Sequence, residues 1–194
     1  KVPKGNEKDV QQAIQAAETA FKEWSDTTAE DRGNALLNAC ELLKKNSAEI
    51  AQLLTQEQGK TLFEAGLEIH HLVHGLEFYA GLASKIRGSH VPLPQKNAYG
   101  MVVRQPIGVC GGIVPWNFPL TLMGTKLGPA LAAGNTIIIK PASTTPLATI
   151  RAIELIQQAK QLSPAAKSLL VVSGFGHDKI IECIAAGAHG CVLE

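Results

Sequence analysis

The chain has 194 residues, of which 45% are hydrophobic and 18% are charged, as is typical of a globular protein with a sizeable core. Its 18 basic and 17 acidic side chains give a formal net charge of +1, so no basic surface for nucleic acid or anionic lipid is expected. Because its apolar runs are far shorter than the roughly 20 residues that span a bilayer, we predict neither nucleic-acid nor membrane partners.

The two ends of the sequence give expectations about where the protein is located and whether the chain is a fragment. The start at Lys1-Val2-Pro3 has no signal-peptide pattern, which favours a cytoplasmic protein with reduced thiols. A start without methionine and an end at Leu193-Glu194 predict a fragment of a longer product.

The first third of the sequence predicts helices over residues 7–86, packed together. Asn6, with Asp9 three residues later, is a plausible cap, and Thr27 with Glu30 predicts a capping box for the second helix. Gly59 is a good left-handed stop for the third helix. The expected helices are one carrying an apolar stripe from Val10 to Trp24, one opening at Thr27 with Leu36, Leu37, Cys40 and Leu43 on its buried side, one over 48–58 and one over 62–82.

From residue 88 onward, turn residues and short β-rich runs replace the helical periodicity. The expected strands are 101–104, 107–114, 136–140 and 169–172, and the expected helices are 119–133 and 146–160. Alternation of strand and helix is typical of parallel crossovers. The sequence therefore predicts an α/β fold in which a helical N-terminal portion, residues 1–87, packs on a parallel Rossmann-like sheet in a cofactor-binding portion, residues 88–194. We expect the two to form one truncated domain.

Ligands of open parallel sheets bind beyond the carboxyl ends of the strands. At one such end, Trp116 and Asn117 lie between Pro115 and Pro119, in a loop that is rigid enough to hold an amide in one direction. That is what a preorganised oxyanion donor requires. Asn117 could also cap the helix that starts at Pro119, and the two roles are compatible.

Lys140 ends the next predicted strand, where nucleotide-binding folds usually place an acidic residue for the 2′-hydroxyl of the ribose. The segment that follows has no carboxylate, and Lys140 with Ser143 would instead favour a 2′-phosphate. The residues therefore indicate NADP as the preferred cofactor over NAD.

No metal site is predicted. His70, His71 and His74 lie close together on one predicted helix, but a metal would need further ligands of fixed geometry. Cys183 and Cys191, with a histidine between them, match no zinc-ligand spacing.

At these residues the chain resembles the NAD(P)-dependent aldehyde dehydrogenase superfamily, over about residues 7–176. The matching motifs are Gln105-Pro106-Ile107-Gly108, Pro115-Trp116-Asn117-Phe118-Pro119, the run from Gly128 to Asn135, Lys140-Pro141-Ala142 and, upstream, Glu57-Gln58-Gly59-Lys60 with Glu64-Ala65 and Glu68. The Lys-Pro-Ala-Ser variant is similar to succinate-semialdehyde dehydrogenase-like members, which often use NADP.

The resemblance implies the roles of particular residues. Asn117 matches the oxyanion-hole asparagine, and Ser143 stands where many NAD-preferring members have glutamate. The cofactor-binding residues that it implies are Ile113, Trp116, Asn117, Lys140, Ser143 and Gly176. The implied reaction is NAD(P)-dependent oxidation of a small aldehyde, such as succinate semialdehyde, to a carboxylic acid.

The sequence also departs from the family. The family's Phe-Thr-Gly-Ser, Glu-Leu-Gly-Gly and Gly-Gln-x-Cys segments are missing, although Cys191 could be the nucleophile if an internal deletion precedes it. The alternative function is therefore an inactive remnant that only folds or oligomerises. In either case apolar faces and strand edges would lack their usual cover, so we expect a homo-oligomer.

Overall fold

The computed structural model describes residues 5–159, and these form a mixed α/β fold. The elements are α1 (Glu7–Asp26), α2 (Ala29–Lys45), α3 (Ser47–Gln58), α4 (Leu62–Leu82), the 3-10 helix η1 (Ala83–Lys85), β1 (Ser89–Pro92), β2 (Tyr99–Val102), β3 (Val109–Ile113), α5 (Pro119–Ala132), β4 (Thr136–Lys140) and α6 (Leu147–Ala159). No helix among them is long and apolar enough to cross a membrane.

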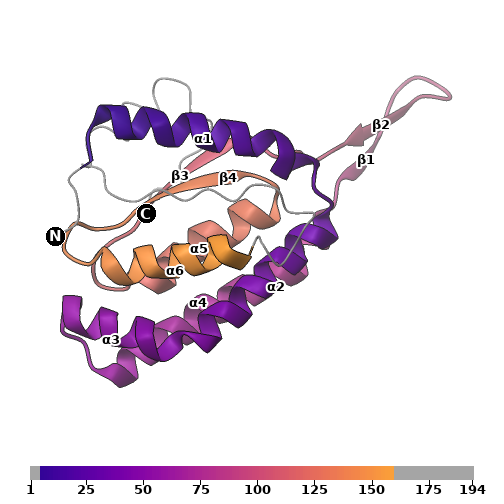
Figure 1. The fold of residues 1–194 in the computed structure, drawn as a ribbon. Coiled ribbons are helices and arrows are strands. Elements are labelled where there is room, and N and C mark those ends of the chain that lie inside the picture. Colours follow the sequence, from indigo (N-terminus) through magenta and orange to yellow (C-terminus); the bar gives the residue numbers. More distant parts are fainter. Residues whose placement is uncertain (1–4, 160–194) are drawn as a thin grey trace.

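The elements lie in layers around a two-stranded parallel sheet (Figure 1). Helix α1 covers one face of β3 and β4, and α5, with α6 beside it, covers the other. Helices α2, α3 and α4 form the next layer against α5 and α6, and the antiparallel hairpin of β1 and β2 projects away from the layers.

The register of the sheet places the two strand ends side by side. Val109 pairs with Thr136 at one end, and Ile113 pairs with Lys140 at the other. The predicted parallel pairing of these strands is confirmed, but the described sheet has two strands only. The further strand predicted over residues 169–172 lies outside the described residues, so the larger Rossmann-like sheet stays a prediction.

One hydrophobic cluster joins the helical portion to the α/β portion, with Trp24, Leu43 and Leu72 packed in the same core as Met123 and Ile139. The portions before and after residue 87 therefore share one hydrophobic core. Whether a domain boundary lies between them stays a prediction.

Helices α4 and α5 approach closely because α5 carries glycine at the contact. A Cβ on Gly128 would lie 2.6 Å from Cδ2 of Tyr79, and one on Gly124 would lie 2.9 Å from Cδ1 of Leu72. Both distances are below what packed carbon atoms allow, so a side chain at either position would force Tyr79 or Leu72 to shift.

The local helix signals are mostly confirmed. Asn6 caps α1 in a capping box with Asp9, and Gly59 ends α3 in the left-handed conformation at φ 90°. The capping box predicted from Thr27 and Glu30 is wrong by one residue. Thr28 accepts the bond from the N–H of Asp31, and Thr27 is the C-cap of α1. On α2, Leu37 is 45% exposed rather than buried.

The strand expected at 101–104 is present as β2, but it lies two residues earlier, and the stretch from residue 88 to 100, expected to be rich in loops, is wrong in part. Residues Ser89–Pro92 form strand β1, which pairs antiparallel with β2 at Tyr99–Val102. The side chains of both strands are mainly exposed, so the period-2 burial pattern that reveals a strand in a sequence is weak here.

The indole of Trp24 predicts a measurable contribution to stability. It is buried and donates from Nε1 to the carbonyl of Leu131 at 3.1 Å. Trp24→Phe removes this hydrogen bond, while the carbonyl of Leu131 still accepts the backbone N–H of Gly134 at 3.0 Å. We therefore expect the free energy of unfolding to fall by about 0.5–1.5 kcal/mol, the net contribution of one hydrogen bond. Urea unfolding followed by circular dichroism measures it. The matched control is Trp116→Phe, at a residue 60% exposed, and an equal loss in both variants would contradict the prediction.

Candidate functional site

The loops that follow β3 and β4 meet at one edge of the sheet. Val114 N–H donates to the carbonyl of Lys140 at 2.9 Å, which extends the pairing by one residue beyond the strands. Farther out, the hydroxyl of Thr145 donates to the carbonyl of Trp116 at 3.4 Å. The structure thus brings the segment of Ile113, Trp116 and Asn117 next to that of Lys140 and Ser143. The remaining predicted site residue, Gly176, lies outside the described residues.

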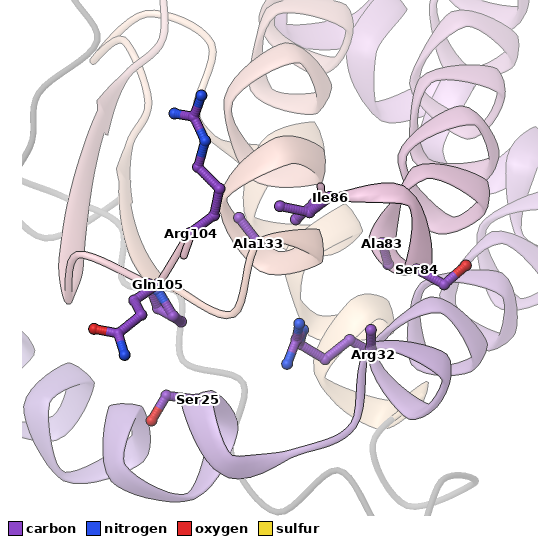
Figure 2. Close-up of a pocket in the computed structure, with 10 residues that line it drawn as sticks. Ser25, Arg32, Ala83, Ser84, Ile86, Arg104, Gln105 and Ala133 are labelled. Atoms are coloured by element: carbon purple, nitrogen blue, oxygen red, sulfur yellow. The ribbon is translucent and has the colours of Figure 1, made fainter. Parts of the chain in front are cut away.

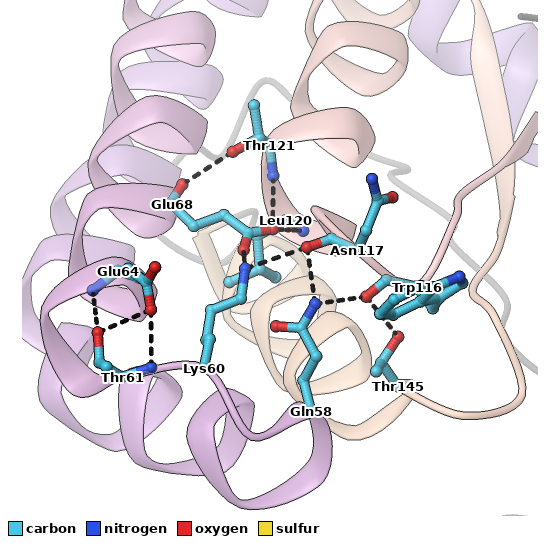
Figure 3. Close-up of polar contacts among 10 residues, drawn as sticks. All are labelled: Gln58, Lys60, Thr61, Glu64, Glu68, Trp116, Asn117, Leu120, Thr121 and Thr145. Atoms are coloured by element: carbon cyan, nitrogen blue, oxygen red, sulfur yellow. Dashed lines mark hydrogen bonds and ion pairs between the residues drawn. The ribbon is translucent and has the colours of Figure 1, made fainter.

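The connection between α3 and α4 holds the backbone of the first loop (Figure 3). Nε2 of Gln58 donates to the carbonyls of Trp116 at 2.8 Å and of Asn117 at 2.7 Å. Nζ of Lys60 donates to the carbonyl of Asn117 at 3.1 Å and lies 4.7 Å from the ring centroid of Phe118. Three consecutive residues of the loop are therefore contacted from the helical layer.

Glu68 supplies the cap of α5. Its side chain is 1% exposed, and its Oε1 accepts the N–H groups of Leu120 at 2.7 Å and of Thr121 at 3.3 Å. Its other oxygen forms an ion pair with Lys60. A carboxylate at the positive end of a helix dipole, paired with an ammonium, is compensated for its removal from water.

The side chain of Asn117 is not the cap of α5. The N-cap residue is Phe118, which makes no side-chain capping bond, and the carboxylate of Glu68 accepts the N–H groups at the start of α5 instead. Asn117 is exposed, and its carboxamide points away from Gln58 and Lys60 (Figure 3). Within residues 5–159 that carboxamide makes no hydrogen bond, so its N–H groups are available to a ligand. The capping alternative is wrong, and the oxyanion role stays a prediction.

Lys140 is buried at the end of β4, with 7% of its surface exposed. Burial lowers the pKa of its ammonium, and no described residue forms an ion pair or side-chain hydrogen bond with it. Ser143, three residues later, is exposed. A buried ammonium without a counter-charge favours an anionic or hydroxyl-bearing ligand at this edge.

Glu57 caps α6 in the way that Glu68 caps α5. Its two carboxylate oxygens accept the N–H groups of Leu147 at 2.7 Å and of Ala148 at 3.0 Å. Burial raises the pKa of this carboxyl, and the two accepted bonds oppose that rise. Both helices that follow the parallel strands are thus capped by acidic residues of the α3–α4 region.

A cavity of about 250 Å³ lies at the opposite end of α5, lined in part by Ser25, Arg32, Arg104 and Gln105 (Figure 2). Its wall is built around Arg32, whose Nε donates to the carbonyl of Ala132 at 3.1 Å. None of its lining residues is a predicted site residue. Among residues 5–159, no group of three histidine, cysteine or acidic side chains could hold a metal ion.

Sequence reasoning named Gln58, Lys60 and Glu68 as parts of a motif but gave them no role. Lys60 and Glu68 pair with each other, but the loop and helix residues that the three side chains hold are more than 50 positions away, as the contact of Glu68 with Leu120 shows. No signal in the sequence points to these contacts, because Asn117 is itself a candidate cap for the 119–133 helix and only the structure shows that it does not cap it.

The comparisons with known proteins identify the family. Residues 1–185 match the aldehyde dehydrogenase family. The chain belongs to this family. It is 41% identical over 160 residues to betaine aldehyde dehydrogenase of Bacillus subtilis, covering 81% of this chain and 33% of that protein. It is 45% identical over 151 residues to 2,5-dioxopentanoate dehydrogenase of Saccharolobus solfataricus, covering 78% and 32%. The chain spans about a third of the length of these relatives.

Solved structures of aldehyde dehydrogenase relatives share the fold. An NADP-dependent enzyme of E. coli superposes with a TM-score of 0.84 at 37% identity, over 92% of this chain and 36% of that one. Betaine aldehyde dehydrogenase of Staphylococcus aureus in complex with NAD⁺ gives a TM-score of 0.81 at 34% identity, over 89% and 34%. The prediction of an N-terminal aldehyde dehydrogenase portion is confirmed.

The buried pair of Lys60 and Glu68 predicts a large cost for breaking it from one side. Lys60→Met leaves Glu68 buried without its ammonium, so we expect the free energy of unfolding to fall by about 3–5 kcal/mol. The double variant Lys60→Met/Glu68→Gln removes the stranded charge and should recover part of that loss. Urea unfolding of the three proteins measures both effects.

The control for this pair is Lys44→Met, because Lys44 forms ion pairs with Glu41 and Glu77 at the surface. Exposed pairs contribute at most about 1 kcal/mol. If Lys60→Met lowers the free energy of unfolding no more than Lys44→Met does, the buried pair of Lys60 and Glu68 contributes no more to stability than an exposed pair.

Proposed function

We propose that the chain forms the cofactor-binding and oxyanion-stabilising part of an NAD(P)-dependent aldehyde dehydrogenase, which oxidises an aldehyde to a carboxylic acid. The observation that carries this proposal is the meeting of the Asn117 loop and the Lys140 loop at the carboxyl ends of two parallel strands, in a chain of this family. Such an edge is the usual ligand position in open α/β sheets, and it supports a Rossmann-like sheet larger than the pair of strands described.

In this reaction a nucleophile adds to the aldehyde carbon and negative charge develops on the carbonyl oxygen. Asn117 offers unengaged side-chain N–H donors from a loop whose backbone is held in place. Donors that need no rearrangement when charge develops stabilise the transition state most effectively. Asn117 is therefore the oxyanion donor of this proposal. The nucleophile is outside the described residues, where Cys191 is one candidate.

The residues of the β4 edge fit a nicotinamide dinucleotide. When bound, this cofactor accepts the hydride that leaves the aldehyde carbon. Lys140 would meet the ribose of the adenosine, where its ammonium has no competing carboxylate, and exposed Ser143 would lie beside it. Because both groups suit a 2′-phosphate, NADP is the preferred cofactor of the proposal and NAD the alternative. Ile113 and Trp116 would line the cofactor from the adjacent strand and loop, with Gly176 beyond the described residues.

The substrate is an aldehyde, with succinate semialdehyde as one candidate. Relatives are named for betaine aldehyde, 2,5-dioxopentanoate and glutarate semialdehyde, so the class is shared and the individual compound varies. The second candidate function is a folded, oligomerising module without catalysis. It is favoured by the match to only about a third of the relatives' length.

The first experiment on cofactor binding is calorimetric titration of the purified chain with NADP and, separately, with NAD. We expect saturable binding that favours NADP, and Lys140→Met should weaken the affinity for NADP by at least about tenfold, the equivalent of one charge-assisted hydrogen bond. The control is Lys126→Met, because Lys126 is a buried lysine of α5 that lies away from the loop after β4. If Lys140→Met weakens the affinities for NADP and NAD equally, the assignment of a 2′-phosphate to Lys140 is contradicted. If the folded chain binds neither cofactor, the result favours the second candidate function, a folded module without catalysis.

The second experiment follows NADPH formation with a panel of aldehydes. If the chain turns over, Asn117→Ala should lower kcat by about 10²–10³-fold, the usual cost of one oxyanion donor, with little change in cofactor affinity. Asn34→Ala, at an exposed asparagine of α2, is the matched control. A kcat equal in the two variants would contradict the role of Asn117.

A further inference from the structure

The exposed loop at Asn117 has a backbone that is held by side chains of another element. Trp116, Asn117 and Phe118 are all exposed, yet two of their three carbonyls accept hydrogen bonds from Gln58, and one of these also accepts from Lys60. The flanking prolines do not fix this loop, because proline restricts only its own φ and the residue before it. Two other bonds reach the loop, from the hydroxyl of Thr145 to the carbonyl of Trp116 at 3.4 Å and from the N–H of Leu122 to that of Phe118 at 3.0 Å, but neither reaches the carbonyl of Asn117.

The backbone carbonyl and the side-chain carboxamide of Asn117 point in different directions. Its backbone carbonyl faces Gln58 and Lys60, while its carboxamide points away from them (Figure 3). Two donors on one carbonyl oxygen determine the direction of that peptide group. Since the position of Cβ follows from the backbone, they also determine the direction in which the carboxamide leaves the chain.

We propose that Gln58 and Lys60 are positioning residues for Asn117, which set the orientation of its carboxamide by holding the carbonyls of residues 116 and 117. This inference rests on the proposed function in one respect: the orientation matters to catalysis only if Asn117 is the oxyanion donor. Neither positioning residue touches the reacting atoms, and both act through the backbone of Asn117.

The orientation of the Gln58 amide is well determined. Both groups within reach of Nε2 are carbonyl oxygens, so only the NH₂ end of the amide suits them. Its Oε1 is buried and has no partner among the described residues. The two donated bonds therefore account for the placement of this side chain.

Gln58 gives a sharper test than Lys60. Lys60 also pairs with Glu68 and lies over Phe118, so its removal would disturb the cap of α5 and the loop together. Gln58→Met keeps the length of the side chain and removes both donors without leaving a buried charge unpaired. Its matched control is Gln56→Met, because Gln56 is an exposed glutamine of the same helix.

The experiment measures order and turnover on the same ¹⁵N-labelled chain. The backbone N–H groups of residues 116–118 report picosecond-to-nanosecond motion of the loop through their heteronuclear NOEs. We expect ordered values in the wild type and in Gln56→Met, and lower values in Gln58→Met at these groups alone. We expect kcat for aldehyde oxidation to fall by about 10–100-fold in Gln58→Met, the range that a misplaced catalytic group produces, with KM for the cofactor unchanged.

Each outcome separates this inference from the proposed function. Unchanged order in Gln58→Met overturns the positioning role, whatever the activity, and lost order with unchanged kcat in an active chain overturns it as well. If no aldehyde is oxidised by the wild type, the proposed function fails for this chain, and the NOE comparison alone decides whether Gln58 orients Asn117. Lys60→Arg keeps a donor and a cation over Phe118, so it should retain the order that Lys60→Met loses.

Discussion

The buried carboxylate of Glu68 is the interaction on which the arrangement of this chain depends. It joins three elements in one group of contacts: its own helix α4, the connection before α4 through Lys60, and the first turn of α5 through the N–H groups of Leu120 and Thr121. Removal of a carboxylate from water is costly unless it is paired and hydrogen-bonded, and here both oxygens have partners. The start of α5 is thereby bound to the helical layer, and the loop before α5 has one end that cannot move.

The start of α6 and the end of α5 are also satisfied by side chains of the N-terminal helices. Glu57 caps the start of α6, and the last carbonyls of α5 accept hydrogen bonds from Trp24 and Arg32 of the first two helices. A helix leaves unsatisfied groups at both ends, and α5 has neither a capping side chain at its start nor a basic residue in its last turn. The N-terminal helices supply what α5 lacks, so the two portions of the chain depend on each other although their sequence patterns differ.

This dependence explains which features could be predicted from the sequence. The caps at Asn6 and Gly59 involve residues at most four positions apart, and the β-branched run of β4 reports its own burial, so local patterns suffice for them. The choice between Thr27 and Thr28 as the second N-cap is also local, but both residues suit the role, and the sequence alone does not distinguish them. Strand β1 has mainly exposed side chains and is defined by its pairing with β2, which no local pattern reveals.

The residues of the candidate site also differ in whether a local pattern reveals them. The motif residues Asn117 and Lys140 could be found because each lies at or just beyond the carboxyl end of a predicted strand. Gln58 and Glu68 act on residues more than 50 positions away, so their roles could not be found. The two lysines of the site show the physical difference between these classes. Lys60 is paired with a carboxylate and donates to a backbone carbonyl, so its charge is used within the fold.

Lys140 is buried to a similar degree, yet no described residue neutralises it, and burial lowers the pKa of its ammonium. A charge that the fold has removed from water without compensating it gains most from a partner that arrives from outside. A paired lysine therefore holds the site together, and the unpaired one is where a ligand carrying negative charge or hydroxyl groups would contribute the most binding free energy.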